Sequence, residues 1–128
     1  MATFEAMAPI EVLIVEDDAS IREGLSDLLS QSGCITAEAP SGRVALELLR
    51  GRLRKPTVIL LDMVMPDMDG WQFRAEQLGD PSLAMIPVII MSASRDALDI
   101  PGQAHIPKPF SSEQLLRTVQ RVARMALG

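Results

Sequence analysis

The stretch that decides the fold runs Thr57-Val58-Ile59-Leu60-Leu61-Asp62, an apolar run that ends in a carboxylate. A second run, Val12-Leu13-Ile14-Val15, ends in the same way in Glu16-Asp17-Asp18. Continuous Val/Ile/Leu runs of this length are typical of strands covered on both faces of a parallel sheet. Because ligands bind at the carboxyl ends of such strands, both runs should deliver acids to one functional edge.

Two more short runs follow along the chain. Val88-Ile89-Ile90-Met91 leads into Ser92, and Ala104-His105-Ile106 leads through Pro107 to Lys108. If these are also parallel strands, their carboxyl ends meet the same edge of the sheet. We therefore expect acids, a hydroxyl and a lysine to converge there.

Residues at helical spacing separate the runs. The spacing predicts helices over 21–29, 44–49 and 71–78, with Ser41 as an N-cap, and a last helix from Ser111, which forms a capping box with Gln114. The inner stripe predicted for the last helix is Leu115, Val119, Val122 and Ala126. Strands alternating with helices imply right-handed parallel crossovers. The predicted fold is therefore doubly wound α/β.

Few strand orders are common in doubly wound sheets, and the flavodoxin-like order 2-1-3-4-5 places the first and third strands side by side. Glu16, Asp17 and Asp62 would then share one crevice of a five-stranded parallel sheet. The crossover over 92–103 is too short for a full helix and two loops, and Pro101-Gly102 would stop any helix within it. We expect a shortened or irregular fourth helix.

Length and composition fit one domain. The chain has 128 residues, 48% of them hydrophobic, and we predict an N-terminal extension over 1–9 and one domain over 10–127. A formal net charge of -5 argues against nucleic acid as a direct partner. The basic cluster of Arg50, Arg52, Arg54 and Lys55 is interpreted as a solvated helix end and loop.

The sequence also predicts where the protein works. Cys34 is the only cysteine, so it has no disulfide partner within the chain, and the first residues lack the pattern of a signal peptide. No apolar run approaches the roughly 20 residues that cross a bilayer. We expect a cytoplasmic protein without a membrane partner.

Three carboxylates in one crevice repel one another, which implies that a cation offsets their charge. An all-oxygen set of few ligands suits Mg²⁺ or Mn²⁺ better than zinc. A carboxylate such as Asp62 can act as a nucleophile toward a phosphoryl group. A metal-bound carboxylate at this edge could therefore take part in phosphoryl transfer.

These ordered motifs resemble the receiver domain of two-component response regulators, from about Ile10 to Leu127. The resemblance implies that Asp62 is the phosphoacceptor and that Glu16 and Asp17 are the acidic pair that binds the cation with Asp62. Val64 would give the cation its backbone carbonyl. Ser92 matches the position where the family has a hydroxyl residue, and Lys108 matches the position of the family's lysine. His105 stands where the family usually has Tyr or Phe, and Val64 and Ser94 match positions that flank the path of attacking water.

The function that the resemblance implies is a signalling switch. A histidine kinase or a histidine phosphotransfer protein would supply the phosphoryl group, and a downstream protein would read the result. The chain would catalyse its own phosphorylation and slow dephosphorylation without turning over external substrates.

Other functions compete with this interpretation. A pseudo-receiver would keep the fold as a protein-interaction module without phosphorylation, and the intact acids, Ser92 and Lys108 argue against it. A hydrolase of the haloacid dehalogenase type would need a second Asp where this chain has Val64. A flavodoxin would place a phosphate beside the acids after the first strand, which would repel it.

Overall fold

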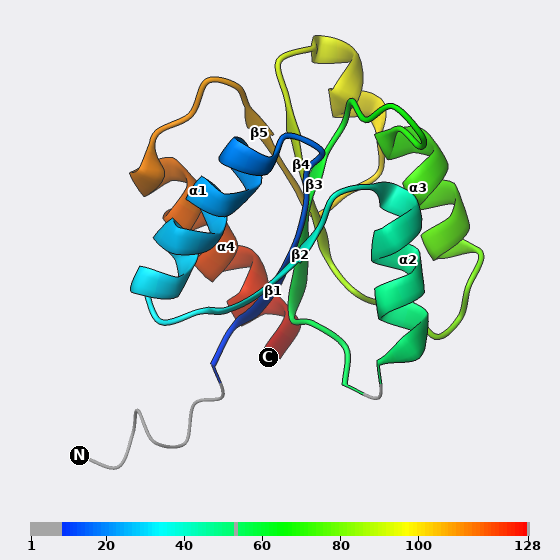
Figure 1. Ribbon diagram of the computed structural model, residues 1–128, viewed down its shortest axis with the longest axis horizontal. Coiled ribbons are helices and arrows are strands. Elements are labelled where there is room, and N and C mark those ends of the chain that lie inside the picture. Colours follow the sequence, from blue (N-terminus) through cyan, green and yellow to red (C-terminus); the bar gives the residue numbers. More distant parts are fainter. Residues whose placement is uncertain (1–8, 53, 128) are drawn as a thin grey trace.

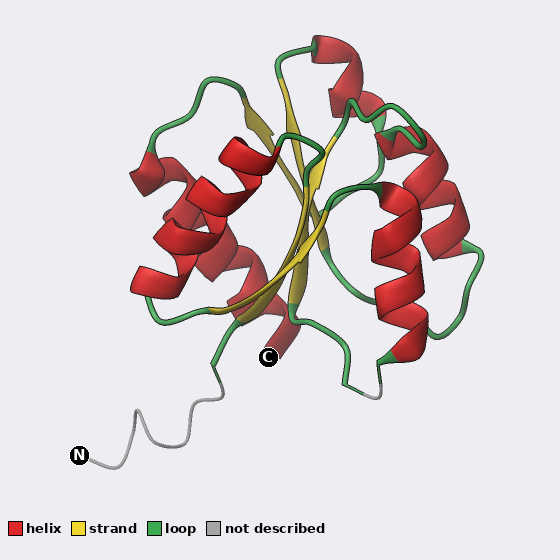
Figure 2. Cartoon of the chain, in the orientation of Figure 1, coloured by secondary structure: helices red, strands yellow, loops and turns green. Residues whose placement is uncertain are grey.

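The computed structural model describes residues 9–52 and 54–127 of the chain, so all of the predicted extension except Pro9 lies outside the described residues. Its centre is a five-stranded parallel sheet in the order β2-β1-β3-β4-β5 (Figures 1 and 2). The strands are β1 (Glu11–Val15), β2 (Ile35–Ala39), β3 (Val58–Asp62), β4 (Val88–Ser92) and β5 (Ala104–Pro107). The predicted fold class and strand order are confirmed.

Helices cover both faces of this sheet. One layer holds α1 (Ala19–Gln31) and α4 (Ser112–Leu127), and the other holds α2 (Gly42–Gly51) and α3 (Gly70–Leu78) (Figure 1). Alternate residues of a strand point to opposite faces, so Val12 and Ile14 pack beneath α1 and α4 while Leu13 and Val15 pack beneath α2 and α3. This double burial explains why β1, β3 and β4 contain continuous apolar runs, whereas the edge strands β2 and β5 are only partly buried and more mixed in sequence.

Each of these helices begins at a side chain that accepts a hydrogen bond from the backbone N–H three residues later. These caps are Asp18 for α1, Ser41 for α2, Asp69 for α3 and Ser111 for α4. Such caps satisfy one of the free N–H groups at a helix start, and at Asp69 and Ser111 a glutamine completes a capping box. The predicted caps Ser41 and Ser111 are confirmed.

One detail of the predicted stripe on α4 is wrong. Ala126 is exposed, and Ala123 is buried with Leu115, Val119 and Val122. The reason is that the last turn of α4 borders an open hollow near the starts of β1 and β3 rather than the core. The rest of the stripe packs on the sheet as expected.

The crossover between β4 and β5 contains only the 3₁₀ helix η2 (Arg95–Asp99), which confirms the predicted shortening. The chain then returns to the sheet through Gly102, where a Cβ atom would lie 3.1 Å from the carbonyl oxygen of Val88. Glycine permits this close approach of two backbone segments. The segment therefore returns without a regular helix.

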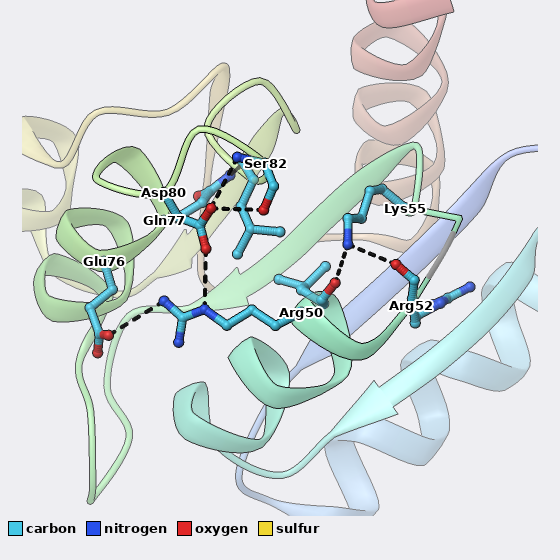
Figure 3. Close-up of polar contacts among 9 residues, drawn as sticks. Arg50, Arg52, Lys55, Glu76, Gln77, Asp80 and Ser82 are labelled. Carbon is cyan, nitrogen blue, oxygen red and sulfur yellow. Dashed lines mark hydrogen bonds and ion pairs between the residues drawn. The ribbon is translucent and has the colours of Figure 1, made fainter.

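The basic cluster at the end of α2 is more ordered than the interpretation as a solvated helix end and loop implied. Arg50 forms ion pairs with Asp80 (3.2 Å) and Glu76 (3.7 Å), and the ammonium of Lys55 donates to the carbonyl oxygens of Leu49 and Arg52 (Figure 3). A lysine that reaches back to the last carbonyls of a helix satisfies acceptors that have no partner within the helix. The cluster therefore closes α2 and ties it to the end of α3.

Candidate functional site

Three acids meet at the carboxyl edge of the sheet. Asp62 is the last residue of β3 and is buried, Glu16 directly follows β1 and is buried, and Asp17 beside it is exposed. One carboxylate oxygen from each residue lies within 4.8 Å of the others. The adjacent β1 and β3 strands impose this arrangement, since both end at the same level of the sheet.

The backbone and side chain of Glu16 are both held in place. Its N–H donates to the carbonyl of Ala39 at 3.1 Å, and its Oε2 accepts from the N–H of Asp18 at 3.1 Å. Its other oxygen, Oε1, is buried and has no hydrogen-bond partner among the described residues. One oxygen of this carboxylate is therefore oriented and available.

Burial is the main cause that raises the pKa of Glu16 to about 7, and the negative charge of Asp62 adds to the shift. The hydrogen bond from the Asp18 backbone and the positive charge of Lys108 act in the opposite direction. In the absence of a cation, this carboxyl group therefore keeps its proton to a higher pH than an ordinary glutamate does. The cluster therefore carries less negative charge than its three acids suggest.

Lys108 completes the group. It follows β5, and its backbone N–H donates to the carbonyl of Ser92 at 2.9 Å. Its ammonium lies 2.9 Å from Oδ1 of Asp62 and 3.8 Å from Oε1 of Glu16. The peptide bond between Lys108 and Pro109 is cis. The Lys108 ammonium thus lies close to both Asp62 and Glu16.

Ser92 and Val64, the other two predicted site residues, lie at or just beyond the ends of neighbouring strands, but within the described part of the chain their side chains form no hydrogen bond with the side chains of the acids or of Lys108. Ser92 ends β4, and its hydroxyl donates to Sδ of Met63 (3.4 Å) and accepts from the N–H of Ser94 (2.9 Å). Val64 follows β3 by two residues, and its side chain is 69% exposed. The structure therefore brings Glu16, Asp17, Asp62 and Lys108 together, with Ser92 beside them at the end of β4 and Val64 on the loop after β3.

His105, which stands three residues before Lys108, is half-buried on β5. Its Nε2 lies 2.8 Å from the carbonyl oxygen of Ile100, so this nitrogen is the donor. The imidazole therefore ties β5 to the end of the shortened crossover.

The cluster fits a hard divalent cation. Its donors are all oxygens, one of them is a buried carboxylate oxygen without a partner among the described residues, and they are few enough to leave places for water or phosphate oxygens. Mg²⁺ and Mn²⁺ favour this kind of site. The residues present are therefore suited to such an ion.

Two residues that matter to this geometry were not singled out from the sequence. Asp18 caps α1 and also fixes the Glu16 carboxylate through its N–H. Arg22, on α1, donates from Nη1 to the carbonyl oxygen of Glu16 at 2.9 Å. Sequence spacing does not predict either bond, because both depend on how the loop after β1 turns into the helix.

Comparison with known proteins shows which family this chain belongs to. The model of the response regulator receiver domain matches residues 12–120. The chain belongs to this family. The strand-end acids, the hydroxyl residue and the lysine thus lie within one receiver domain.

The receiver is similar to full-length regulators over about half of their length. Response regulator MprA of Mycolicibacterium vanbaalenii is 32% identical over 125 residues, which are 91% of this chain and 51% of the relative. Transcriptional regulatory protein PdtaR of Mycobacterium tuberculosis is 35% identical over 121 residues, which are 91% of this chain and 58% of the relative.

Solved structures of similar sequence share the fold. The signal receiver domain of a signal transduction histidine kinase from Syntrophus aciditrophicus has a TM-score of 0.81 and 32% identity, and covers 89% of each chain. The chemotaxis response regulator CheY4 of Vibrio cholerae has a TM-score of 0.81 and 28% identity, with 90% of this chain and 99% of that chain covered.

Receiver domains bind Mg²⁺ through acidic residues and interact with histidine kinases or downstream targets, and this receiver has a matching acidic cluster. Within the described part of the chain, none of the helices combines the length and the apolar character that a bilayer crossing requires.

Proposed function

We propose that Asp62 accepts a phosphoryl group from the phosphohistidine of a histidine kinase or a histidine phosphotransfer protein, and that the receiver thereby acts as a cytoplasmic signalling switch. The observation that carries the proposal is the Lys108 ammonium 2.9 Å from the Asp62 carboxylate, beside two further acids. This set supplies a nucleophile, a fixed cation and a place for a divalent ion.

In the proposed reaction an oxygen of Asp62 attacks the phosphorus in line while the bond from phosphorus to the donor breaks. Glu16, Asp17, Asp62 and the backbone carbonyl of Val64 would hold Mg²⁺ or Mn²⁺. The bound ion would neutralise charge on the transferred group. Lys108 already lies within bonding distance of Asp62 and would pair with one phosphoryl oxygen.

Ser92 would carry the signal. Its hydroxyl now contacts the thioether of Met63, which is a weak acceptor. A phosphoryl oxygen on Asp62 is a much stronger acceptor and would draw the hydroxyl and its loop toward the site. We infer that this exchange of partners changes the surface that a downstream protein reads.

The donor protein has a suitable place to dock. An open apolar hollow of about 380 Å³ lies beside Lys108, lined by Ile21, Ala93, Lys108, Pro109 and Phe110. Ile21 is 47% exposed, so its apolar surface is available to a partner. A donor seated here would bring its phosphohistidine near the carboxyl edge of the sheet. Kinases make phosphohistidine from ATP, which supports the proposal that the exchange occurs in the cytoplasm.

The direct test is the intact mass of the protein after incubation with acetyl phosphate and Mg²⁺. We expect the addition of one phosphoryl group, which is lost on hydrolysis because an acyl phosphate is labile. No addition would favour a pseudo-receiver, the alternative that the intact acids and lysine make less favourable.

Mg²⁺ should stabilise the folded protein. At a concentration about 100-fold above its dissociation constant, an ion that binds only the native state adds roughly 2.7 kcal/mol to the free energy of unfolding. Urea denaturation with Mg²⁺ and with EDTA measures this difference. Asp17→Asn should lose most of the effect, and Asp27→Asn, which changes an exposed acid elsewhere on α1, should keep it. Identical curves for the wild type in both solutions would refute a cation site.

Val64 should lengthen the life of the phosphorylated state. Its exposed side chain flanks the predicted path of water and cannot hydrogen-bond to it. Val64→Asn should speed hydrolysis by up to about tenfold, which corresponds to one added hydrogen bond. Val64→Ile keeps the apolar surface and should not speed hydrolysis. The decay of phosphoprotein mass with time is the measurement, and a rate for Val64→Asn at or below that of the wild type would show that Val64 does not shield the group.

A further inference from the structure

Arg22 stands in an unusual place for a cation. It lies four residues after Asp18, the N-cap of α1, so it belongs to the amino end of the helix. The helix dipole disfavours positive charge at this end. Its side chain is nevertheless only 15% exposed, which means that the fold holds the guanidinium in a defined position.

The guanidinium joins two segments that end at the acidic edge. Nη1 donates to the carbonyl oxygen of Glu16 at 2.9 Å, and Nε donates to Oε1 of Glu38, on β2, at 3.1 Å. The planar fork of arginine suits two bonds in fixed directions. Arg22 thereby anchors the loop after β1 to the neighbouring edge strand.

The bond from Arg22 to the carbonyl oxygen of Glu16 fixes the second backbone group of Glu16. The N–H of Glu16 is held by the carbonyl of Ala39 on β2, and its carbonyl is held by Arg22. With both backbone groups fixed, the side chain can direct its Oε1, which accepts no hydrogen bond from the described residues, toward Asp62 and the Lys108 ammonium 3.8 Å away. Asp17 follows directly in the chain, so its position depends on the same restraint.

We propose that Arg22 is a positioning residue for the cation site: it fixes the loop that carries Glu16 and Asp17 through the backbone of Glu16, without touching the ion or the phosphoryl group. The inference rests on the proposed function, because it concerns the same site. Groups that orient metal ligands from behind typically contribute 10- to 100-fold to metal affinity.

Arg22 could affect the site by holding the loop in place or by its positive charge, and these two effects predict opposite changes in Mg²⁺ affinity when Arg22 is replaced. Arg22→Met removes a positive charge near a site for a divalent cation, so charge alone would tighten Mg²⁺ binding. Loss of positioning would weaken it instead, by about tenfold or more. Arg22→Lys keeps the charge but loses the two-bond fork, and positioning predicts that it also weakens binding.

The experiment is isothermal titration calorimetry of Mg²⁺ into the phosphate-free protein at one fixed pH, with urea denaturation to verify that each variant is folded. Arg50→Met is the matched control, because Arg50 forms a comparable ion pair at 3.2 Å but joins α2 to Asp80, away from the acids. We expect weaker binding for both Arg22 variants and wild-type affinity for Arg50→Met.

Unchanged or tighter binding in the Arg22 variants would overturn the inference while the proposed function stands. The same holds if Arg50→Met weakens binding as much as Arg22→Met does, since the effect would then come from general loss of stability. A wild-type protein that does not bind Mg²⁺ would overturn the proposed function and the inference with it. Glu38→Gln should weaken binding less than Arg22→Met, because the bond from Arg22 to Glu16 remains.

Discussion

Asp62→Asn should abolish phosphorylation by acetyl phosphate and leave the fold intact. An amide has almost the same shape as the carboxylate but is not a nucleophile for phosphorus. The variant removes one negative charge from a cluster in which three acids lie within 4.8 Å, and this relieves repulsion. Lys108 loses the negative charge 2.9 Å away, although the amide oxygen can still accept its hydrogen bond, and it keeps Glu16 at 3.8 Å. The metal-free variant should therefore be as stable as the wild type or more stable.

Two measurements check this prediction: intact mass after incubation with acetyl phosphate and Mg²⁺, and urea denaturation in EDTA. Asp67→Asn is the control, because Asp67 is an exposed acid of the same loop that should form part of a turn only. It should be phosphorylated like the wild type. Phosphorylated Asp62→Asn would mean that another residue is the acceptor, and a clear loss of stability would mean that Asp62 makes a structural bond.

The central strands of the sheet could be predicted because burial leaves a simple trace in the sequence. Strands covered on both faces must be apolar at every position, so Val58 to Leu61 and Val88 to Met91 stand out as unbroken runs. The alternation with helices then restricts the topology to a few choices. The shortened crossover followed from chain length and from Pro101-Gly102, since 92–103 cannot span the sheet as a full helix and the Pro-Gly pair stops any helix within it.

The acids of the site were equally visible, because they lie at or just beyond the carboxyl ends of two strands and parallel strands end at one edge. The sequence alone did not distinguish acids that face the cation site from an acid that caps a helix. Asp18 belongs to the same acidic run as Glu16 and Asp17, but its side chain caps α1. Whether an acid faces the crevice or turns to the helix depends on backbone angles at the strand end, which residue types alone do not determine.

Polar residues that bond to the backbone were the hardest to predict. Arg22 and Lys55 each use a long side chain to reach carbonyl groups in other segments. A cation in a helix or loop normally indicates a solvent-exposed face. Its partner here is a main-chain oxygen, and since every residue has one, the sequence holds no signal for the pairing.

Gln77→Leu should destabilise the protein by about 3 kcal/mol, because it removes a fully buried amide whose hydrogen bonds tie α3 to the loop before β4. Its Nε2 donates to the carbonyls of Leu83 (3.0 Å) and Ile86 (2.9 Å), and its Oε1 accepts from Arg74. Arg74 is itself buried, and its Nε donates to the carbonyl of Pro101 beyond η2. Burial lowers the pKa of this guanidinium, since the charged form is poorly solvated there.

Leucine nearly fills the same volume, so packing changes little and the loss comes from the groups left without partners. The carbonyl of Ile86 and part of a charged guanidinium would lose the amide as their partner, whereas the carbonyl of Leu83 keeps the N–H of Ile86 at 3.1 Å. The midpoint and slope of urea denaturation in EDTA measure the effect. The control is Gln120→Leu, on the exposed face of α4, which should stay within about 0.5 kcal/mol of the wild type.

Gln77→Glu separates the two halves of the network. It keeps an acceptor for Arg74 but turns a carboxylate oxygen toward two carbonyls, so it should also destabilise the protein. A loss below about 1 kcal/mol for Gln77→Leu would show that water or local rearrangement satisfies these groups, and that the network does not bind α3 to the loops around it.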